Sequence, residues 1–350
     1  MCASDKAFMR LALAEGKKHL GATAENPSVG CIITNDGEVV GRAVTGIGGR
    51  PHAETQALAQ AGDQANGATA YVTLEPCAHH GQTPPCAEAL IDAGVARVVT
   101  AVQDPDPRTA GDGHRALRAA GIEVVTGVLE DEARRDHAGF LSRIERGRPY
   151  TILKLAVSKD GMLSAAPGKQ TAITGKAANE HVHMMRAQAD AIMIGAGTAR
   201  VDDPSLTCRL EGYEDRSPIR VVIASDPGSL NTLSMLKTRE QIPVWFLTLH
   251  DGPDHIVCAK TANAAVDLND GMKMLAARGI GRLMVEGGAE ISSGLLELDL
   301  IDEIVLITGP QNLGDGGVAA PLELISPDKF NETVTLVLGD DRLTTYVRAQ

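Results

Sequence analysis

In the first 146 positions, two kinds of segment alternate along the chain. Some are short runs of apolar residues, and others have apolar residues at helical spacing. Phe8, Leu11, Ala12 and Leu13 recur at helical spacing, and later apolar runs such as Val95–Val102 indicate strands. The Asp36-Gly37 step suits a hairpin turn. The pattern predicts helices at 5–20, 53–62, 86–93, 113–120 and 130–146, and strands at 28–34, 39–44, 70–74, 95–102 and 122–126.

A second set of elements begins after Gly147, Arg148 and Pro149. Gly and Pro interrupt regular structure, so we predict two domains, 1–146 and 147–350. The second is expected to be an α/β unit that ends in antiparallel strands, and the pattern assigns no element to 253–270. Its predicted elements are a helix at 176–187 and strands at 150–157, 191–195, 219–224, 244–249, 282–286, 303–308, 333–338 and 343–349.

Length and composition narrow the class of protein. The 350 residues fit two domains of roughly 100–200 residues each, and 43% hydrophobic with 22% charged residues is ordinary for a globular chain. No apolar run approaches the roughly 18–20 residues of a membrane span, and residues 1–21 do not form a signal peptide. We therefore expect a cytoplasmic protein with no membrane partner.

The net charge of −12 and the 3% aromatic content argue against a nucleic-acid partner. Phosphate contacts need clustered cations, and base stacking needs aromatic side chains. Residues 1–146 carry 14 Lys and Arg against 19 Asp and Glu, a balance of −5, and the remainder carries 19 against 26, a balance of −7. Neither half contains a basic run.

Three potential metal ligands stand in the first half. His52 and Glu54 open a predicted helix, Cys77 follows a predicted strand, and Cys86 begins another helix. One His and two Cys ligands leave the fourth position of a tetrahedral Zn²⁺ for water, which is the catalytic arrangement. Such a water becomes a nucleophile near neutral pH, and Glu54 is placed to take its proton. The alternatives are a structural zinc site or a Cys pair that only packs.

Helix N-termini supply a further reason for this prediction. Exposed N–H groups at the starts of the helices near His52 and Cys86 favour a thiolate over a thiol. His79 and His80 lie between the two cysteines and either touch substrate or are solvated. We interpret the other cysteines as bystanders, with Cys31 in the core; they are Cys2, Cys31, Cys208 and Cys258.

This pattern resembles the His-x-Glu and Pro-Cys-x-x-Cys signature of zinc-dependent cytidine and nucleobase deaminases. Eight residues separate the cysteines here, where the short form has two. The longer form, with the segment Asn26–Cys31, is similar to the deaminase half of riboflavin-biosynthesis proteins of the RibD type. The resemblance implies a cytidine-deaminase-like three-layer α/β/α domain, a diaminopyrimidinone substrate bearing a ribosylamino 5′-phosphate, and a role for Asn26 in holding the pyrimidine.

Two glycine turns mark the second half, although no Gly-x-Gly-x-x-Gly follows its first strand. One runs from Gly195 to Thr198, and the other is Gly287-Gly288-Ala289 before a helix. Such turns let backbone N–H groups approach a pyrophosphate, but they also serve tight packing. Glycine alone does not separate the two interpretations.

A wider set of motifs in this half resembles the RibD reductase half. They are the stretches Lys154–Gly161, Ile173–Gly175, Arg186, Asp202–Arg209 and Glu286–Gly288. The resemblance implies a dihydrofolate-reductase-like α/β domain that uses NADPH to reduce the ribosyl group of the deaminated product to a ribityl chain. It also implies residues that line the substrate, namely Lys154, Gln170, Arg186, Leu206, Arg209 and Glu286. The residues implied for NADPH are Ala156, Ala172, Thr198, Asp202, Gly287 and Gly288.

Particular roles follow from the resemblance and from side-chain chemistry. Arg186 and Arg209 are expected to clamp the phosphate, since guanidinium binds phosphate bidentately. Glu286 would accept hydrogen bonds from the sugar. The family often has Ser-x-Trp where this chain has Gln170-Thr171-Ala172, so Gln170 and Ala172 depart from its pattern.

Three hypotheses result. The first is a bifunctional zinc- and NADPH-dependent enzyme of riboflavin biosynthesis that acts on a small phosphorylated pyrimidine and self-associates as its family does. The second is a nucleobase or tRNA-editing deaminase fused to an unrelated reductase-like domain, which the charge opposes. The third is a non-enzymatic zinc-binding regulator, against which the presence of Glu54 counts.

Overall fold

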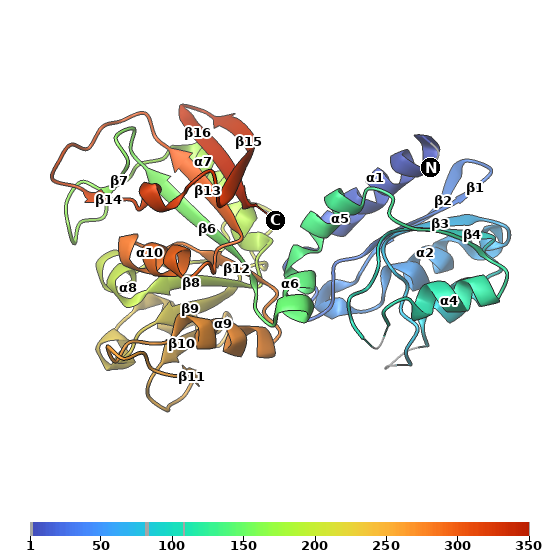
Figure 1. Cartoon of the computed structure of the whole chain (residues 1–350), viewed down its shortest axis with the longest axis horizontal. Helices are drawn as coiled ribbons and strands as arrows, with labels where there is room; N and C mark the ends of the chain where they lie inside the picture. Colours follow the sequence, from blue (N-terminus) through green and yellow to red (C-terminus); the bar gives the residue numbers. More distant parts are fainter. Residues whose placement is uncertain (1–2, 81–83, 108, 350) are drawn as a thin grey trace. The chain divides into compact units, whose positions relative to one another are not determined.

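The structure, a computed structural model, describes residues 3–80, 84–107 and 109–349. The chain forms two compact units, Met1–Arg146 and Gly147–Gln350 (Figure 1). No helix in the described ranges combines the length and the apolar character that crossing a membrane requires.

Within the described residues, the first unit has a five-stranded sheet of order β2-β1-β3-β4-β5. β1 pairs antiparallel with β2 and β3, whereas β3, β4 and β5 run parallel. Its strands are β1 (Gly30–Asn35), β2 (Glu38–Val44), β3 (Thr69–Leu74), β4 (Arg97–Val102) and β5 (Glu123–Val125). Its helices are α1 (Ala3–Lys17), α2 (Ala53–Ala61), α3 (Cys86–Asp92), α4 (Asp112–Ala119), α5 (Glu130–Asp136) and α6 (Ala138–Arg146).

Helices cover both faces of this sheet, which makes three layers. α1 and α5 contact each other on one face, and α2, α3 and α4 contact one another in turn on the other (Figure 1). Ala12 of α1, Ile32 of β1 and Ala57 of α2 are fully buried in one shared core. The segments that follow β2 and β3 lead to the N-terminal ends of α2 and α3.

One predicted helix of this unit is wrong. The stretch 130–146 forms two helices, α5 and α6, which are separated at His137. The His137 ring is buried, and its Nε2 lies 3.0 Å from the Thr73 hydroxyl of β3. This contact holds the break between the helices against the sheet.

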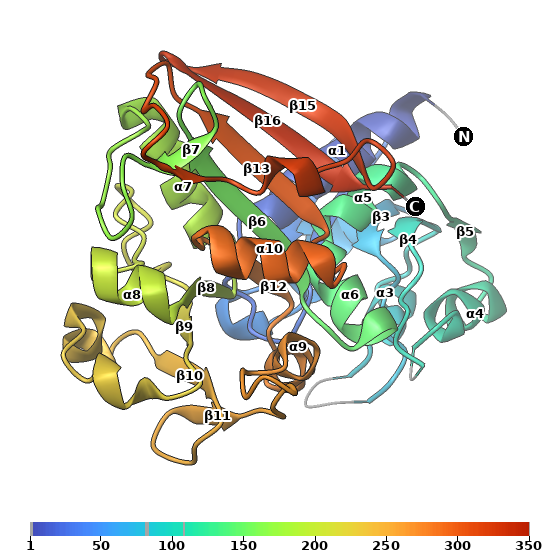
Figure 2. The same cartoon turned by 60° about the vertical axis from the view of Figure 1, so that its left-hand side comes forward.

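The second unit contains a nine-stranded sheet among the described residues, with order β11-β10-β9-β8-β12-β6-β13-β16-β15. The strands from β11 to β13 pair in parallel. β16 then pairs antiparallel with both β13 and β15, which gives the predicted antiparallel finish (Figure 2). The strands of this unit are β6 (Tyr150–Val157), β7 (Met162–Ser164), β8 (Ala191–Gly195), β9 (Ile219–Ile223), β10 (Val244–Thr248), β11 (His255–Val257), β12 (Arg282–Val285), β13 (Glu303–Thr308), β14 (Val318–Ala319), β15 (Phe330–Leu338) and β16 (Asp341–Arg348).

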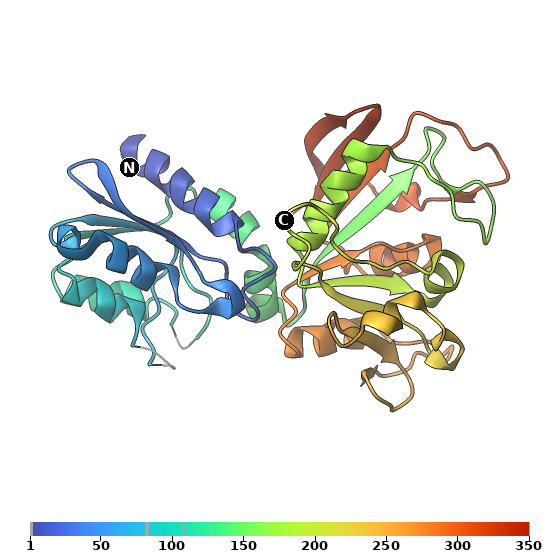
Figure 3. The ribbon, with the colours of Figure 1, turned by 180° about the vertical axis from the view of Figure 1, so that it is seen from behind.

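Two apolar clusters cover the two faces of this sheet. Leu153 and Leu155 of β6 belong to one cluster with residues of α9 and α10, whereas Ile152 belongs to the other with residues of α7 and α8. Figure 3 shows α7 along β6 from behind. The helices are α7 (Lys176–Ala187), α8 (Ala196–Asp202), α9 (Leu268–Ala277) and α10 (Ala289–Glu297).

The stretch 253–270, for which the pattern predicted nothing, holds β11 and the start of α9. The carboxylate of Asp267 caps that helix, because it accepts hydrogen bonds from the N–H groups of Asn269 and Asp270. The remaining short elements are the small β7–β14 sheet and the 3₁₀ turns Ile47–Gly49, Gly62–Ala65, Pro227–Leu230, Ser234–Thr238 and Leu322–Leu324.

Two candidate active sites

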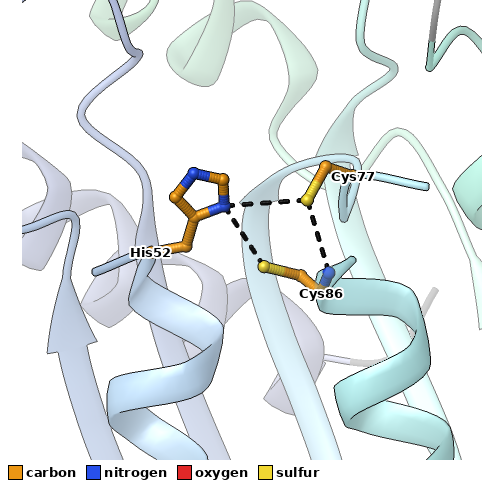
Figure 4. Close-up of side chains that lie close together, drawn as sticks. All are labelled: His52, Cys77 and Cys86. Carbon is orange, nitrogen blue, oxygen red and sulfur yellow. Dashed lines mark hydrogen bonds between the residues drawn. The ribbon is translucent and has the colours of Figure 1, made fainter. Parts of the chain in front are cut away.

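His52, Cys77 and Cys86 meet where α2 and α3 begin. His52 caps the N-terminus of α2, Cys77 follows β3, and Cys86 is the first residue of α3. His52 Nδ1 lies 3.3 Å from Cys86 Sγ and 3.6 Å from Cys77 Sγ (Figure 4). Tetrahedral ligands at zinc–nitrogen and zinc–sulfur bond lengths lie roughly 3.5 Å apart. The donor set therefore fits a zinc ion.

The group is also suited to an open coordination position. All three ligand atoms lie within 4.8 Å of one another, and among the described residues no fourth His, Cys, Asp or Glu belongs to the group. Three protein ligands are typical of a catalytic zinc, whereas a structural zinc has four.

The surroundings of Cys77 favour its thiolate. The Cys86 thiol and the His52 ring donate hydrogen bonds to Cys77, and so does the backbone N–H of Cys86 at 3.3 Å. These bonds lower the pKa of Cys77 to about 4, although burial opposes the shift. The surrounding hydrogen bonds thus favour the ionised form that a zinc ligand needs.

Glu54 lies beside this group, in the first turn of α2. Its residue is 4% exposed. Burial, and next the negative charge of Cys77, raise the pKa of Glu54 to about 7. A carboxyl group with such a pKa both accepts and donates protons at neutral pH, which is what a proton shuttle requires.

Asn26 lies against the turn that precedes His52. A Cβ atom on Gly49 would stand 2.2 Å from Asn26 Nδ2, and Gly49 has φ +90°. Only glycine therefore leaves room for the Asn26 amide at this point. The turn that leads to His52 and the predicted pyrimidine-holding residue are packed against each other.

Glu75 is a residue of this site whose role the sequence did not indicate. Its side chain is fully buried, two residues before Cys77, and it accepts backbone hydrogen bonds from Asp104, Gly111 and His114 at 3.1–3.3 Å. These bonds join the segment that holds Cys77 to the 104–114 segment. The Leu74-Glu75-Pro76 stretch is visible in the sequence, but the partners of Glu75 lie 29 to 39 residues further along the chain.

The two spare histidines of the loop contact side chains outside it. His79 Nδ1 lies 3.0 Å from Thr109 Oγ1, and the exposed His80 pairs with Glu88 at 3.1 Å. Residues 81–83 lie outside the described residues.

The remaining cysteines fit their predicted character where the structure describes them. Cys31 is fully buried in β1, as predicted. Cys208 and Cys258 are buried and free, and Cys2 lies outside the described residues.

A second polar cluster lies at the carboxyl end of β12, beside the middle of β6. Glu286 follows β12 and binds Arg186 of α7 through two contacts, at 2.6 Å to Nε and 3.0 Å to Nη2. Lys154 Nζ of β6 is 3.5 Å from the same carboxylate. Ligands of open α/β sheets bind at this edge.

Two cations dominate the electrostatics of Glu286. Burial raises its pKa, but the charges of Lys154 and Arg186, with their hydrogen bonds, outweigh burial and lower the pKa to about 2. Arg186 also donates from Nη1 to the Thr207 carbonyl at 3.1 Å. Three N–H groups of Arg186 are therefore used within the chain, which differs from a free phosphate clamp.

Arg209, unlike Arg186, is open to solvent. Its residue is exposed, and its Nη1 donates to the Ser205 hydroxyl at 2.8 Å. Leu206, which lies between Ser205 and Arg209 in the chain, is buried and has a φ of +53°. The guanidinium of Arg209 keeps donors available to a ligand.

The two glycines of the Gly287-Gly288 turn differ in their surroundings. A Cβ atom on Gly287 would stand 2.0 Å from Ile291 Cγ2, so this glycine is required by packing. Gly288 caps α10, and a Cβ atom there would touch Thr198 Oγ1 at 3.4 Å. The structure thus brings Thr198 of α8 and Gly288 together.

The other predicted residues are more dispersed. Ala156 follows Lys154 at the next position on the same face of β6, and Asp202 ends α8. Gln170 and Ala172 lie in an exposed coil, where the Ala172 carbonyl accepts from Gln311 at 2.7 Å. Within the described ranges, no hydrogen bond joins Gln170 to Glu286 or its partners.

A zinc-type deaminase unit followed by a reductase unit is the class that this fold and these sites define. Residues 2–102 match the family described as cytidine and deoxycytidylate deaminase zinc-binding region, and residues 149–341 match the RibD C-terminal domain. The chain belongs to the RibD family of riboflavin-biosynthesis enzymes, which join a deaminase and a reductase.

Relatives cover nearly the whole chain. The chain is 41% identical to riboflavin biosynthesis protein RibD of Haemophilus influenzae, over 89% of this chain and 87% of the relative. It is 38% identical to RibD of Aquifex aeolicus over 98% of both. The solved structure of Acinetobacter baumannii RibD superposes with a TM-score of 0.90, at 35% identity over 99% of both chains.

A second solved structure comes from Thermotoga maritima. It has a TM-score of 0.87 at 30% identity over 99% of both chains, and it is described as a diaminohydroxyphosphoribosylaminopyrimidine deaminase/5-amino-6-(5-phosphoribosylamino)uracil reductase. The fold class and the bifunctional activity predicted from the sequence are confirmed, and the RNA-editing alternative is not supported.

Proposed function

We propose that the first unit deaminates 2,5-diamino-6-ribosylamino-4(3H)-pyrimidinone 5′-phosphate at a zinc ion held by His52, Cys77 and Cys86. The observation that carries this proposal is the three-ligand group with the buried Glu54 beside it. The substrate class is supported by the activity named for the Thermotoga maritima relative.

The residues around the zinc would divide the work of deamination. Zinc supplies an activated water near neutral pH when it is bound. Glu54 takes a proton from that water and returns it to the departing amine, so that water and the aminopyrimidine become a pyrimidine carbonyl and ammonia. Asn26 holds the ring through its amide, in the space that Gly49 leaves open.

Glu54→Gln tests this mechanism. Glutamine keeps the volume but neither accepts nor delivers a proton, so ammonia release should fall roughly 10²- to 10⁴-fold. Zinc content should stay unchanged, and so should NADPH-dependent reduction of pre-deaminated substrate. Glu88→Gln, on the exposed side of α3, is the matched control. Ammonia release that persists in Glu54→Gln would remove Glu54 from the reaction.

For the second unit we propose hydride transfer from NADPH to the ribosyl carbon, which opens the sugar to a ribityl chain. Ala156, Thr198, Asp202 and the Gly287-Gly288 turn would hold NADPH, and the proximity of Thr198 to Gly288 supports this assignment. Ala172 would contribute only an apolar contact to the cofactor, because its side chain is a methyl group. Comparing NADPH with NADH oxidation by the purified protein tests the cofactor.

The substrate side of this site follows from its charges. Lys154 would polarise the pyrimidine carbonyl, and Glu286 would accept from the sugar hydroxyls while Arg186 orients it. Arg209 would be the main residue that binds the substrate phosphate, because its guanidinium is exposed. Leu206 and Gln170 remain substrate-lining residues by resemblance alone.

Self-association is a further part of the proposal. β15 is an edge strand with exposed apolar residues, among them Val337 at 77% and Val334 at 46% exposure. Long apolar edges invite pairing with another strand, so a second copy is a suitable partner. Sedimentation of wild type and Val337→Lys tests this. Location in the cytoplasm and the absence of a nucleic-acid partner remain predictions from the sequence.

A further inference from the structure

The segment from Asp203 to Arg209 has a backbone that needs outside support. Asp203 and Leu206 have φ values of +38° and +53°, in the left-handed region that residues with side chains rarely adopt. Such strain persists only where the surroundings hold it. The segment ends in Arg209, whose guanidinium is exposed.

Helix α7 supplies much of that support. Arg186 donates from Nη1 to the Thr207 carbonyl at 3.1 Å, and the Cys208 thiol donates to the His183 carbonyl at 3.3 Å. The backbone N–H of Arg209 donates to His183 Nδ1 at 3.2 Å. The last of these contacts fixes the backbone of the residue that we propose to bind phosphate.

We propose that His183 is a positioning residue of the reductase, which in its neutral form holds the Arg209 backbone in the phosphate-binding position. The inference rests on the proposed role of Arg209. Nδ1 accepts the hydrogen bond only while it bears no proton. A protonated ring would set an N–H against the N–H of Arg209, and the contact would be lost.

The charges around His183 favour the neutral ring. Arg186 on the same helix and Arg209 on the loop oppose its protonation, whereas Glu286 beyond β12 and a hydrogen bond to the Thr207 backbone favour it. Partial burial and the two cations lower the pKa of His183 below its ordinary value of 6.5. The hydrogen bond is therefore intact at neutral pH and is lost on the acid side.

Three variants separate this role from general support of the fold. His183→Ala removes the acceptor, whereas His183→Asn places an amide oxygen near the Nδ1 position and does not titrate. His181→Ala is the matched control, since within the described residues no hydrogen bond links its ring to 203–209. NADPH oxidation on pre-deaminated substrate gives KM and kcat for each protein from about pH 5.5 to 8.

His183→Ala should raise KM about 2- to 10-fold at neutral pH with little change in kcat, as expected for one neutral hydrogen bond. Wild-type KM should rise toward acid pH. His183→Asn should restore the neutral KM and lose that acid rise, while His181→Ala should match wild type. Ammonia release should be equal in all four proteins.

Other outcomes distinguish the possible failures. An unchanged KM in His183→Ala, or a wild-type KM that falls toward acid pH, overturns the positioning role. Absence of NADPH oxidation in the wild-type protein instead overturns the proposed reductase reaction itself.

Discussion

Gly49 controls the space available to the side chain of Asn26. A Cβ atom on residue 49 would stand 2.2 Å from Asn26 Nδ2, so a methyl group there would push the Asn26 amide away. Asn26 is the residue that we propose to hold the pyrimidine. The position of one polar group in the deaminase site thus depends on a residue that has no side chain.

Gly49→Ala is predicted to lower kcat/KM for ammonia release by at least about tenfold, since it displaces Asn26 and strains the backbone. Gly48→Ala provides the matched control. Gly48 also has positive φ, +78°, but nothing lies within 4 Å of a Cβ atom there. Equal loss of kcat/KM in the two variants would assign the effect to backbone strain and not to Asn26.

Residues differ in how far their partners could be predicted. His52, Glu54, Cys77 and Cys86 form a local motif, and zinc chemistry alone requires that these types meet. The partner of Arg186 was not predictable, because Glu286 is a hundred residues away and reaches it through the order of strands in the sheet. The sequence therefore predicted a free guanidinium where the fold provides a bound one.

At the scale of elements, the break between α5 and α6 depends on a buried histidine. His137 is 3% exposed, its Nε2 lies 3.0 Å from the Thr73 hydroxyl, and its Nδ1 has no partner within the described residues. Burial lowers the pKa of His137 to about 4. The folded protein thus keeps this ring neutral.

The stability of the first unit should consequently fall in mild acid. Below about pH 6.5 the unfolded chain binds a proton at His137 that the folded chain binds only near pH 4, so the free energy of unfolding decreases as pH falls between these values. The shift corresponds to at most about 3 kcal/mol. Urea unfolding of the zinc-loaded protein at several pH values measures it.

His137→Gln isolates this contribution because its amide does not titrate. Its free energy of unfolding should decline less between pH 6.5 and 4 than that of wild type, whatever its value at pH 7. His80→Gln, which replaces an exposed histidine, should keep the wild-type slope. Equal slopes in all three proteins would mean that His137 is protonated in the folded state.

Sequence patterns predicted elements well where burial follows a regular period. β6, α7, β8 and β13 have the predicted bounds, because both faces of their sheet are covered and the apolar runs are complete. β15 begins three residues before its predicted start, since it is an exposed edge with little apolar alternation. A tertiary contact of one side chain, such as that of His137, leaves no periodic signal at all.

At the scale of the whole molecule, each unit has apolar clusters of its own. One buried cluster contains residues from Met9 to Leu141, and the other two contain residues from Ile152 to Leu343. The two halves are also both acidic, so neither supplies the positive charge that anionic ligands need. Each site must concentrate cations locally, as Lys154, Arg186 and Arg209 do in the second unit.

Separate clusters predict separate responses to ligands. Zinc binds only the folded first unit and NADP⁺ only the folded second unit under our proposal, and a ligand at 100 times its Kd stabilises a fold by about 2.7 kcal/mol. In scanning calorimetry of the full chain, chelation of zinc should lower one transition by several degrees, about 2–4 °C per kcal/mol. NADP⁺ should raise the other transition.

Cys77→Ser assigns the zinc-dependent transition, because it removes a ligand. That variant should show the lowered transition without chelator and no further response to it, whereas Cys258→Ser, which changes a buried free thiol of the second unit, should respond to chelation as wild type does. A single transition that both ligands shift together would show that the two units unfold as one, since each ligand would then stabilise the same cooperative fold.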